Sequence, residues 1–407
     1  MSLGRGLLSS GPRGATTKIL AFGSLFIFLA TVYTLFPSTP KKAWATLSSP
    51  FSSRVRGQCP PEAYADGKWV HQAPPAPNVT MTSMDDALPI VGFEGCASSR
   101  EYYWHLASDR PEQWDRFPGV ASWRWDPSSE CEGLRPLDPE ALVQDLVENG
   151  GWLLIGDSVT ENHFFSLSCI LYPHVIATPN YTDLPFYERH WPQNLYLSPS
   201  SPLVEYLNPP VGFNISTTPL VTFRRVDVML SREQLVDLHH DLYDPPLGVN
   251  LFSEEAFWSL PPSQYLSIFQ KPLPAANYRT MVVSTAGHWT TTLMAGFHDE
   301  AAEGGGIRRI LGFFRHAMTK WADEIQAAMS RDTGTAGGRR TREVVEVVSS
   351  RSYPNIHFLG IDRPGMLRPD AHSTGDCLHI MSGAGVLEGW THYIWHYITR
   401  ELPGRIR

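Results

Sequence analysis

The segment Trp152-Leu-Leu-Ile-Gly-Asp-Ser-Val-Thr-Glu-Asn-His163 decides how the rest of this chain is interpreted. Residues 152–155 are apolar without interruption, which is typical of a strand buried on both faces. Gly156 permits a tight turn, and from Val159 onward apolar residues recur at the spacing of one helix face. The segment therefore predicts a strand, a sharp turn and a helix, with Ser158 at the turn.

In that position Ser158 would have an exposed hydroxyl and the backbone N–H groups of a helix N-terminus around it. Such N–H groups can stabilise the oxyanion that forms when a serine attacks a carbonyl carbon. The tripeptide at 156–158 is by itself more often an ordinary turn. A catalytic role therefore depends on whether the chain supplies a base and an orienting acid elsewhere.

The composition describes a large globular chain. Its 407 residues can form a substantial core and as many as two domains. The hydrophobic fraction is 42% and the charged fraction 18%, which excludes a disordered protein. A net charge of −8, without a basic block interleaved with aromatics, argues against a nucleic-acid partner. The 13 tryptophans fit core packing and a sugar-stacking surface equally well.

Residues 19–36 form an apolar run without a charged side chain. A membrane-spanning helix needs about 20 apolar residues, whereas the apolar part of a cleaved signal peptide has about 7–15. We therefore expect an uncleaved signal anchor at 19–36, a cytosolic tail at 1–18 and a stem at 37–57. Basic residues lie on both sides of the run, so their count does not set the orientation.

Glycosylation sequons and cysteines favour a luminal body. Sequons begin at Asn78, Asn180 and Asn214, all after the apolar run. All five cysteines also follow it, and they lack the spacing of a zinc site, so we expect no bound metal. The expected protein is a single-pass type II protein of the Golgi membrane.

Residues 58–148 are rich in tryptophan, proline and cysteine, and we expect a loop-rich lead-in held by disulfides and aromatic packing. Within it, Arg124 lies between Trp123 and Trp125. This pattern predicts an arginine stacked on tryptophan or, alternatively, a residue that lines a glycan groove. Residues 139–148 predict a short amphipathic helix directly before the strand that leads to Ser158.

Residues 149–407 alternate between strand-like and helical patterns, which predicts an α/β domain with a mainly parallel sheet. Strand-like runs occupy 221–230, 281–283, 344–348 and 356–361, and helical patterns occupy 307–328 and 386–402. The remainder of 172–280 predicts long loops at a sheet edge. Ligands bind at the carboxyl ends of such strands, so His288 is expected at the same edge as Ser158.

Asp376 and His379 are the strongest candidates for an acid and a base. Three residues separate them, so a single turn brings the carboxylate beside the imidazole. The carboxylate can then accept from Nδ1–H and leave Nε2 to take the proton of Ser158. Asp370 and His372 form a second pair, but an extended segment would hold them less well.

The motifs together resemble a known family. Gly-Asp-Ser at 156–158 with Asp-Cys-Leu-His at 376–379 resembles the signature of SGNH/GDSL-type esterases. More closely, the chain is similar to the trichome-birefringence-like polysaccharide O-acetyltransferases, the PC-esterase family, over about residues 58–400. The further matching elements are Trp123-Arg-Trp125 with Cys131, Asn162 and Cys169, Ala286-Gly-His-Trp289, and Arg368-Pro-Asp-Ala-His372.

The resemblance implies an SGNH-hydrolase-like, three-layer α/β/α domain behind the lead-in and the membrane anchor. It implies Ser158 as nucleophile, His379 as general base and Asp376 as the residue that orients the base. The matched motifs also imply these substrate-binding residues: Gly156, Asp157, Asn162, Gly287, His288, Trp289, Arg368, Asp370, His372 and Arg124. By position they imply the disulfides Cys59–Cys131 and Cys96–Cys169, which leave Cys377 unpaired.

Two positions depart from the family pattern. The family has arginine three residues after its serine, where this chain has Glu161, and a second cysteine after Asp-x-x-His, where this chain has Met381. If the family's arginine helps to hold the oxyanion, this chain must use other donors, such as the Ser158 N–H and Asn162.

The expected function is that of a luminal, membrane-anchored O-acetyltransferase without a bound cofactor. It would move an acetyl group from a donor such as acetyl-CoA to a hydroxyl of a polysaccharide or glycan through an acyl-serine. Two alternatives remain. One is a carbohydrate or acyl esterase with the same triad, because exclusion of water decides between transfer and hydrolysis. The other is a catalytically silent glycan-binding protein, which Glu161 would favour.

Overall fold

The computed structural model describes residues 58–184, 188, 191–332, 343–345, 353–373 and 375–405. The chain divides into two compact units, Met1–Val55 and Arg56–Arg407, and all described residues belong to the second. The expected tail, anchor and stem lie outside the described residues, as does the end of the strand expected at 344–348. Within the described ranges, no helix is both long and apolar enough to cross a bilayer.

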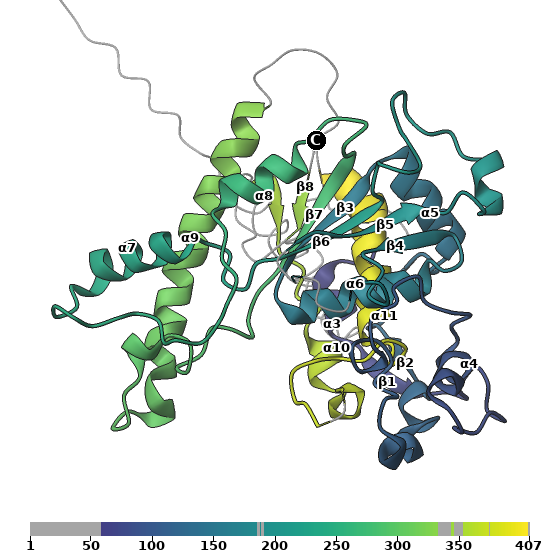
Figure 1. The fold of residues 1–407 in the computed structure, drawn as a ribbon, viewed down its shortest axis with the longest axis horizontal. Coiled ribbons are helices and arrows are strands. Elements are labelled where there is room, and N and C mark those ends of the chain that lie inside the picture. The colour runs from purple at the N-terminus through teal and green to yellow at the C-terminus, as the bar shows by residue number, and fades with distance from the viewer. Residues whose placement is uncertain are drawn as a thin grey trace, which may run out of the picture. The chain divides into compact units, whose positions relative to one another are not determined.

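A mixed sheet forms the centre of this unit, with strand order β4-β5-β6-β3-β7-β8-β9 among the described residues. Figure 1 labels the strands from β4 to β8. The run from β6 through β3, β7 and β8 to β9 is parallel, whereas β4 and β5 add an antiparallel edge beside β6. The strands are β3 (Gly151–Gly156), β4 (Val175–Thr178), β5 (Gln193–Leu197), β6 (Val221–Arg225), β7 (Tyr278–Ser284), β8 (Glu343–Val345) and β9 (Ile356–His357). The expected α/β class is confirmed.

Strand β3 lies inside the sheet and is buried along its whole length, as its apolar run predicts. Successive side chains of a strand point to opposite faces. Trp152 and Leu154 accordingly join one apolar core, and Leu153 and Ile155 join the other. The sheet therefore has a hydrophobic core on each face.

Helices cover both faces of the sheet. The core with Trp152 is completed by α5 (Pro139–Glu148), α6 (Ser158–Ile170) and α11 (Val386–His396). The core with Leu153 is completed by α7 (Arg232–Tyr243), α8 (Pro262–Phe269) and α9 (Ile307–Asp332). The helices expected at 139–148 and 307–328 are confirmed. The closing helix is also found, but it continues from α11 as a π-helical segment, Tyr397–Glu401, before α12 (Leu402–Arg405).

The prediction of long loops over most of 172–280 is correct only in part: loops fill much of that range, but β4, β5, α7 and α8 also lie within it. The strands are short and flanked by proline, so their patterns do not stand out. Helix α7 does carry a local signal, since Ser231 and Gln234 form a reciprocal capping box. The strand expected at 221–230 ends at Arg225, because the Asp227 N–H bonds to the Trp258 carbonyl instead (2.7 Å).

The lead-in contains α3 (Pro61–Ala65), α4 (Ala87–Val91) and the antiparallel pair β1 (Lys68–His71) and β2 (Trp123–Asp126). Its two disulfides join the cysteines that the family resemblance implied. Cys59 pairs with Cys131 and Cys96 with Cys169, and Cys377 is free and exposed. Because Cys169 lies on α6, the second bridge ties the lead-in to the helix that begins at Ser158.

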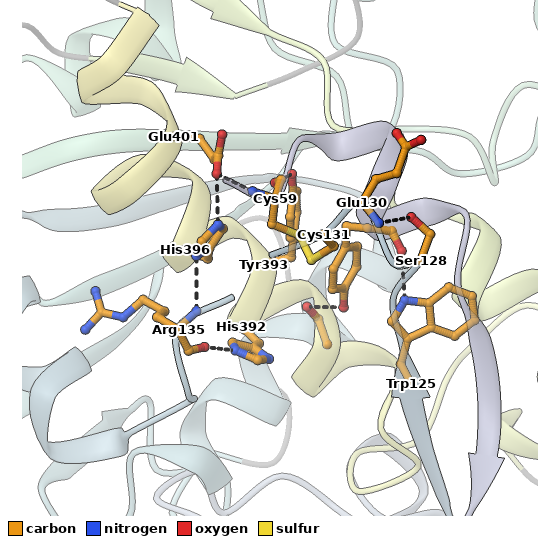
Figure 2. The surroundings of a disulfide bond; sticks show 12 residues. Cys59, Trp125, Ser128, Glu130, Cys131, Arg135, His392, Tyr393, His396 and Glu401 are labelled. Carbon is orange, nitrogen blue, oxygen red and sulfur yellow. Dashed lines mark hydrogen bonds and ion pairs between the residues drawn. A yellow bond between two sulfur atoms is a disulfide. The ribbon is translucent and has the colours of Figure 1, made fainter. Parts of the chain in front are cut away.

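The first disulfide lies against the end of α11 (Figure 2). The Cys59 N–H donates to Glu401 Oε1 (2.6 Å), and the Tyr393 hydroxyl donates to the Cys59 carbonyl (2.8 Å). The His396 ring accepts from the Arg135 N–H (3.3 Å) and donates from Nε2 to Glu401 (3.2 Å). These bonds attach the start of the lead-in to the last helices of the domain.

Arg124 lies in β2, where alternation separates it from the two tryptophans beside it in sequence. Its guanidinium pairs with Asp126 at 3.2 Å. The expected stack of an arginine on tryptophan is made by a different residue, since the Arg368 guanidinium lies 4.6 Å from the centre of the Trp69 ring. The prediction that Arg124 makes this stack is therefore wrong.

Reduction is expected to destabilise this unit strongly. The bridges join residues 72 and 73 positions apart, and closing a loop of that length removes about 4 kcal/mol of chain entropy from the unfolded state. Thermal unfolding with and without reductant measures the effect. Cys377→Ser is the control, because it removes a thiol without removing a bridge, and it should show the same loss on reduction. An unchanged melting temperature under reduction would contradict the prediction.

Candidate active site

The predicted strand, turn and helix are present around Ser158. Gly156 ends β3 in a space that admits no side chain, because a Cβ there would lie 2.4 Å from the Ser284 carbonyl oxygen. Asp157 is the N-cap of α6, and its Oδ1 accepts from the Val159 N–H (3.0 Å). Ser158 is the first residue of the helix, where the first backbone N–H groups have no carbonyl partner within the helix.

Ser158, His379 and Asp376 form a continuous chain of hydrogen bonds. His379 Nε2 lies 2.6 Å from Ser158 Oγ, and His379 Nδ1 lies 2.5 Å from Asp376 Oδ2. Ser158 is 5% exposed, and the side chains of His379 and Asp376 are 15% and 18% exposed. The two motifs are therefore joined in the geometry of a serine, a base that can take its proton, and an acid that orients the base.

The loop that carries the acid and the base is closed by its own backbone. The Ser373 N–H donates to the His379 carbonyl (2.8 Å), and His372 pairs with Ile380 in an antiparallel bridge. His372 thus lies at the base of this loop, whereas His379 reaches Ser158. Of the two histidines that the sequence offered as bases, the structure brings only His379 into contact with the serine.

Hydrogen bonds keep Asp376 ionised. Partial burial raises the pKa of this carboxyl group. The bond from the His379 side chain, the N–H groups of His379 (3.0 Å) and Leu378 (2.6 Å), and attraction to the imidazole outweigh burial. The net pKa lies well below the usual 3.8. Asp376 therefore presents a negative charge to His379 Nδ1 at any pH near neutrality.

The segment after β7 packs against the serine turn. Asp157 Oδ2 accepts from the N–H groups of Gly287 (3.2 Å) and Ala286 (3.4 Å). Trp289 is buried, and its indole N–H donates to Thr285 Oγ1 (2.9 Å). The contacts of Asp157, Gly287 and Trp289 are thus with the protein, and they hold the ends of β3 and β7 together.

His288 faces a buried carboxylate that the sequence interpretation missed. Its Nε2 lies 3.7 Å from Oδ2 of Asp227, which is fully buried beyond the end of β6. Asp227 also accepts from Arg225 Nε (2.9 Å) and from the Trp258 N–H (2.8 Å). Arg225 and Asp227, which lie at and just beyond the end of β6, were the available signal, but the expected strand continued through them to residue 230. His288 therefore lies at the carboxyl edge of the sheet, as predicted.

Arg368 and Asp370 brace the loop that carries Asp376 and His379 against the lead-in. Arg368 is only 3% exposed and donates to both carboxylate oxygens of Asp370 (2.8 and 2.9 Å). It also donates to the carbonyl groups of Ala384 and Val120, each at 2.7 Å. The guanidinium of Arg368 therefore donates its hydrogen bonds to other groups of the protein. The observed contacts of this motif are structural.

Asn162 and Glu161 are both buried on α6. Asn162 Nδ2 donates to the Trp104 carbonyl (3.0 Å), which leaves its second hydrogen for another acceptor. Glu161, in place of the family's arginine, is 1% exposed, and its Oε1 accepts from Gln193 Nε2 (2.6 Å). Glu161 therefore ties α6 to the start of β5.

This contact predicts a stability effect at Glu161. Glu161→Ala leaves the buried amide of Gln193 without its acceptor and should lower the free energy of unfolding by about 1–3 kcal/mol. Glu161→Gln keeps an acceptor oxygen and should be closer to the wild type. Denaturant unfolding measures both. A loss in Glu161→Gln as large as in Glu161→Ala would show that the charge, and not the hydrogen bond, is required.

The lead-in also contacts the triad, which no sequence motif predicted. The Tyr103 hydroxyl donates to Asp376 Oδ2 at 3.0 Å. The two residues are 273 positions apart, and tyrosine in a proline-rich lead-in is not distinctive, so only the fold reveals the contact.

No model of a known protein family and no curated protein matches this chain. The resemblance to the polysaccharide O-acetyltransferases therefore rests on the motifs within the chain.

Proposed function

We propose that this protein is an O-acetyltransferase that moves an acetyl group to a hydroxyl of a polysaccharide or glycan through an acyl-Ser158 intermediate. The observation that carries the proposal is the hydrogen-bonded chain from Ser158 through His379 to Asp376. The motifs shared with the PC-esterase family support the acetyl group and the glycan acceptor.

The first half of the proposed reaction acylates the enzyme. His379 Nε2 takes the Oγ proton as Ser158 Oγ attacks the carbonyl carbon of the acetyl donor, and Asp376 stabilises the imidazolium that results. When the tetrahedral intermediate collapses, the bond to the donor's leaving group breaks. His379 returns the proton to that group, which leaves acetyl-Ser158 and a neutral imidazole.

The second half transfers the acetyl group. His379 takes the proton of an acceptor hydroxyl, whose oxygen attacks the acetyl-Ser158 carbonyl. Collapse of this second intermediate breaks the bond to Ser158 Oγ, which regains a proton from His379. With water as the acceptor, the same steps make the protein an esterase.

The proposed oxyanion donors are the backbone N–H of Ser158, at the start of α6, and the second Nδ2 hydrogen of Asn162. A helix N-terminus favours negative charge, and its amide groups are already oriented in the folded protein. Gly287 is a less suitable donor because its N–H is bonded to Asp157.

We place the reaction in the lumen of the Golgi, on the membrane anchor expected at 19–36. Two disulfides fit an oxidising compartment. The sequon residues Asn78, Asn180 and Asn214 are all exposed, as acceptors of glycans must be.

The test is to incubate the purified full-length protein in detergent with acetyl-CoA or p-nitrophenyl acetate, with and without neutral and acidic oligosaccharides. Acetylated oligosaccharide, detected by mass spectrometry and absent with Ser158→Ala, is the expected result. Free acetate alone would assign an esterase. Binding of oligosaccharide without turnover of either donor would assign a glycan-binding protein.

A further inference from the structure

Residues 103 and 104 of the lead-in contact three polar groups of the candidate active site. They end the 3₁₀ turn Tyr102–Trp104, which is outside the α/β domain in sequence. Tyr103 bonds to Asp376, the Trp104 ring meets His379, and the Trp104 carbonyl accepts from Asn162.

The Tyr103 bond completes the set of donors around Asp376. Oδ1 accepts from two backbone N–H groups, and Oδ2 accepts from His379 Nδ1 and from the Tyr103 hydroxyl. A carboxylate offers about four lone-pair positions, so each has a donor and the group cannot rotate without losing bonds. Burial, followed by the bond and the charge of Asp376, raises the pKa of Tyr103, which keeps the phenol a neutral donor.

Trp104 restrains the other two groups. Its ring meets the His379 ring edge-on, with 5.2 Å between centroids and 84° between planes. Its carbonyl holds Asn162, one turn along α6 from Ser158, through the 3.0 Å bond from Nδ2. One residue thus sets the position of both the imidazole and the amide.

The turn itself is held in place from two directions. The Arg100 guanidinium lies 5.3 Å from the centre of the Trp104 ring and 4.8 Å from that of Tyr181. The Cys96–Cys169 bridge joins the segment covalently to α6, and the Ala97 N–H donates to the Ser168 carbonyl (2.9 Å). The turn is therefore attached both covalently and by a hydrogen bond to the helix that carries Ser158.

We propose that Tyr103 and Trp104 are positioning residues that hold Asp376, His379 and Asn162 in the reactive geometry. The lead-in is then part of the active site and not only a cap over the domain. This inference rests on the proposed nucleophilic role of Ser158, but not on the identity of the acyl donor or acceptor.

The test compares Tyr103→Phe with Tyr102→Phe. Tyr102 precedes it in the same turn, and its hydroxyl bonds to Asp85 instead of the triad, so Tyr102→Phe is a matched control. A fluorophosphonate, which phosphonylates an activated serine, measures Ser158 reactivity without any acceptor. We expect Tyr103→Phe to lower the labelling rate and kcat about tenfold, with KM and melting temperature unchanged, because it removes one bond to a charged group. Tyr102→Phe should leave the labelling rate and kcat unchanged.

Two further variants separate positioning from folding. Trp104→Phe keeps an aromatic edge and the backbone carbonyl, so it should retain much of the reactivity that Trp104→Ala loses. In an Asp376→Ala background, Tyr103→Phe should cost nothing further, because its partner is gone.

The inference is overturned if Tyr103→Phe labels at the wild-type rate, or if it and Tyr102→Phe lose reactivity in equal measure along with melting temperature. It is also overturned if wild-type Ser158 is not labelled, since there is then no activated serine to position. Labelling that depends on Tyr103, without acetyl transfer to any glycan, would reject the proposed function and leave the positioning role intact.

Discussion

Replacing Ser158 or His379 by alanine is expected to lower kcat for acyl transfer by about 10⁶-fold. Without Oγ no acyl-enzyme can form, and without the imidazole no group 2.6 Å from Oγ can take its proton. Because the two side chains act as one unit, the double variant should lose little more than either single variant. Initial rates with p-nitrophenyl acetate, together with melting temperatures to show intact folding, measure the effect.

His372→Ala is the control for the assignment of the base. His372 lies in the bridge to Ile380, so its loss should leave most of the activity in protein that folds. If His379→Ala kept most of its activity and His372→Ala lost it, the assignment of His379 as the base would be wrong.

Replacing Asp376 by asparagine is expected to lower kcat by about 10⁴-fold. The neutral amide no longer stabilises the imidazolium. It can also present an N–H to His379 Nδ1, which would favour the tautomer that carries its proton on Nε2 and cannot accept from Ser158. Rates at saturating donor measure kcat, and KM should change little.

The matched comparison is Asp370→Asn, which alters the other aspartate–histidine pair, Asp370 and His372. Asp370 pairs with Arg368, so this variant should lower the melting temperature. Its kcat should stay much closer to the wild-type value than that of Asp376→Asn. Because the pKa of Asp376 is held below its usual value, Asp376 stays ionised well below neutral pH, and kcat of the wild type should not fall through protonation of Asp376 as the pH drops moderately below neutrality. Equal losses of kcat in the two variants would contradict the assignment of Asp376.

Local patterns explain what could be predicted. An apolar run followed by Gly156 specifies β3 and the turn, because burial and backbone freedom are properties of adjacent residues. Asp376 and His379 are three residues apart, so their contact also needs only local structure. The helices α5 and α9 were found from their apolar periodicity in the same way.

Weak local patterns explain the errors. Strands β4 and β5 have four and five residues, and proline on either side obscures their alternation. Arg124 was expected to stack on its sequence neighbours, but strand geometry points neighbouring side chains to opposite faces. The stack instead forms between Arg368 and Trp69, which meet only in the folded chain.

The sequence by itself determined the α/β class, the turn that presents Ser158 and the pairing of Asp376 with His379, since each depends on residues near one another in the chain. Only the tertiary structure decided that His379 and not His372 reaches the serine, that Glu161 is bound to Gln193, and that Tyr103 completes the donors around Asp376. Those contacts join side chains separated by 221, 32 and 273 positions. Their formation depends on how the sheet, α6 and the disulfide-linked lead-in pack, which no short stretch of sequence encodes.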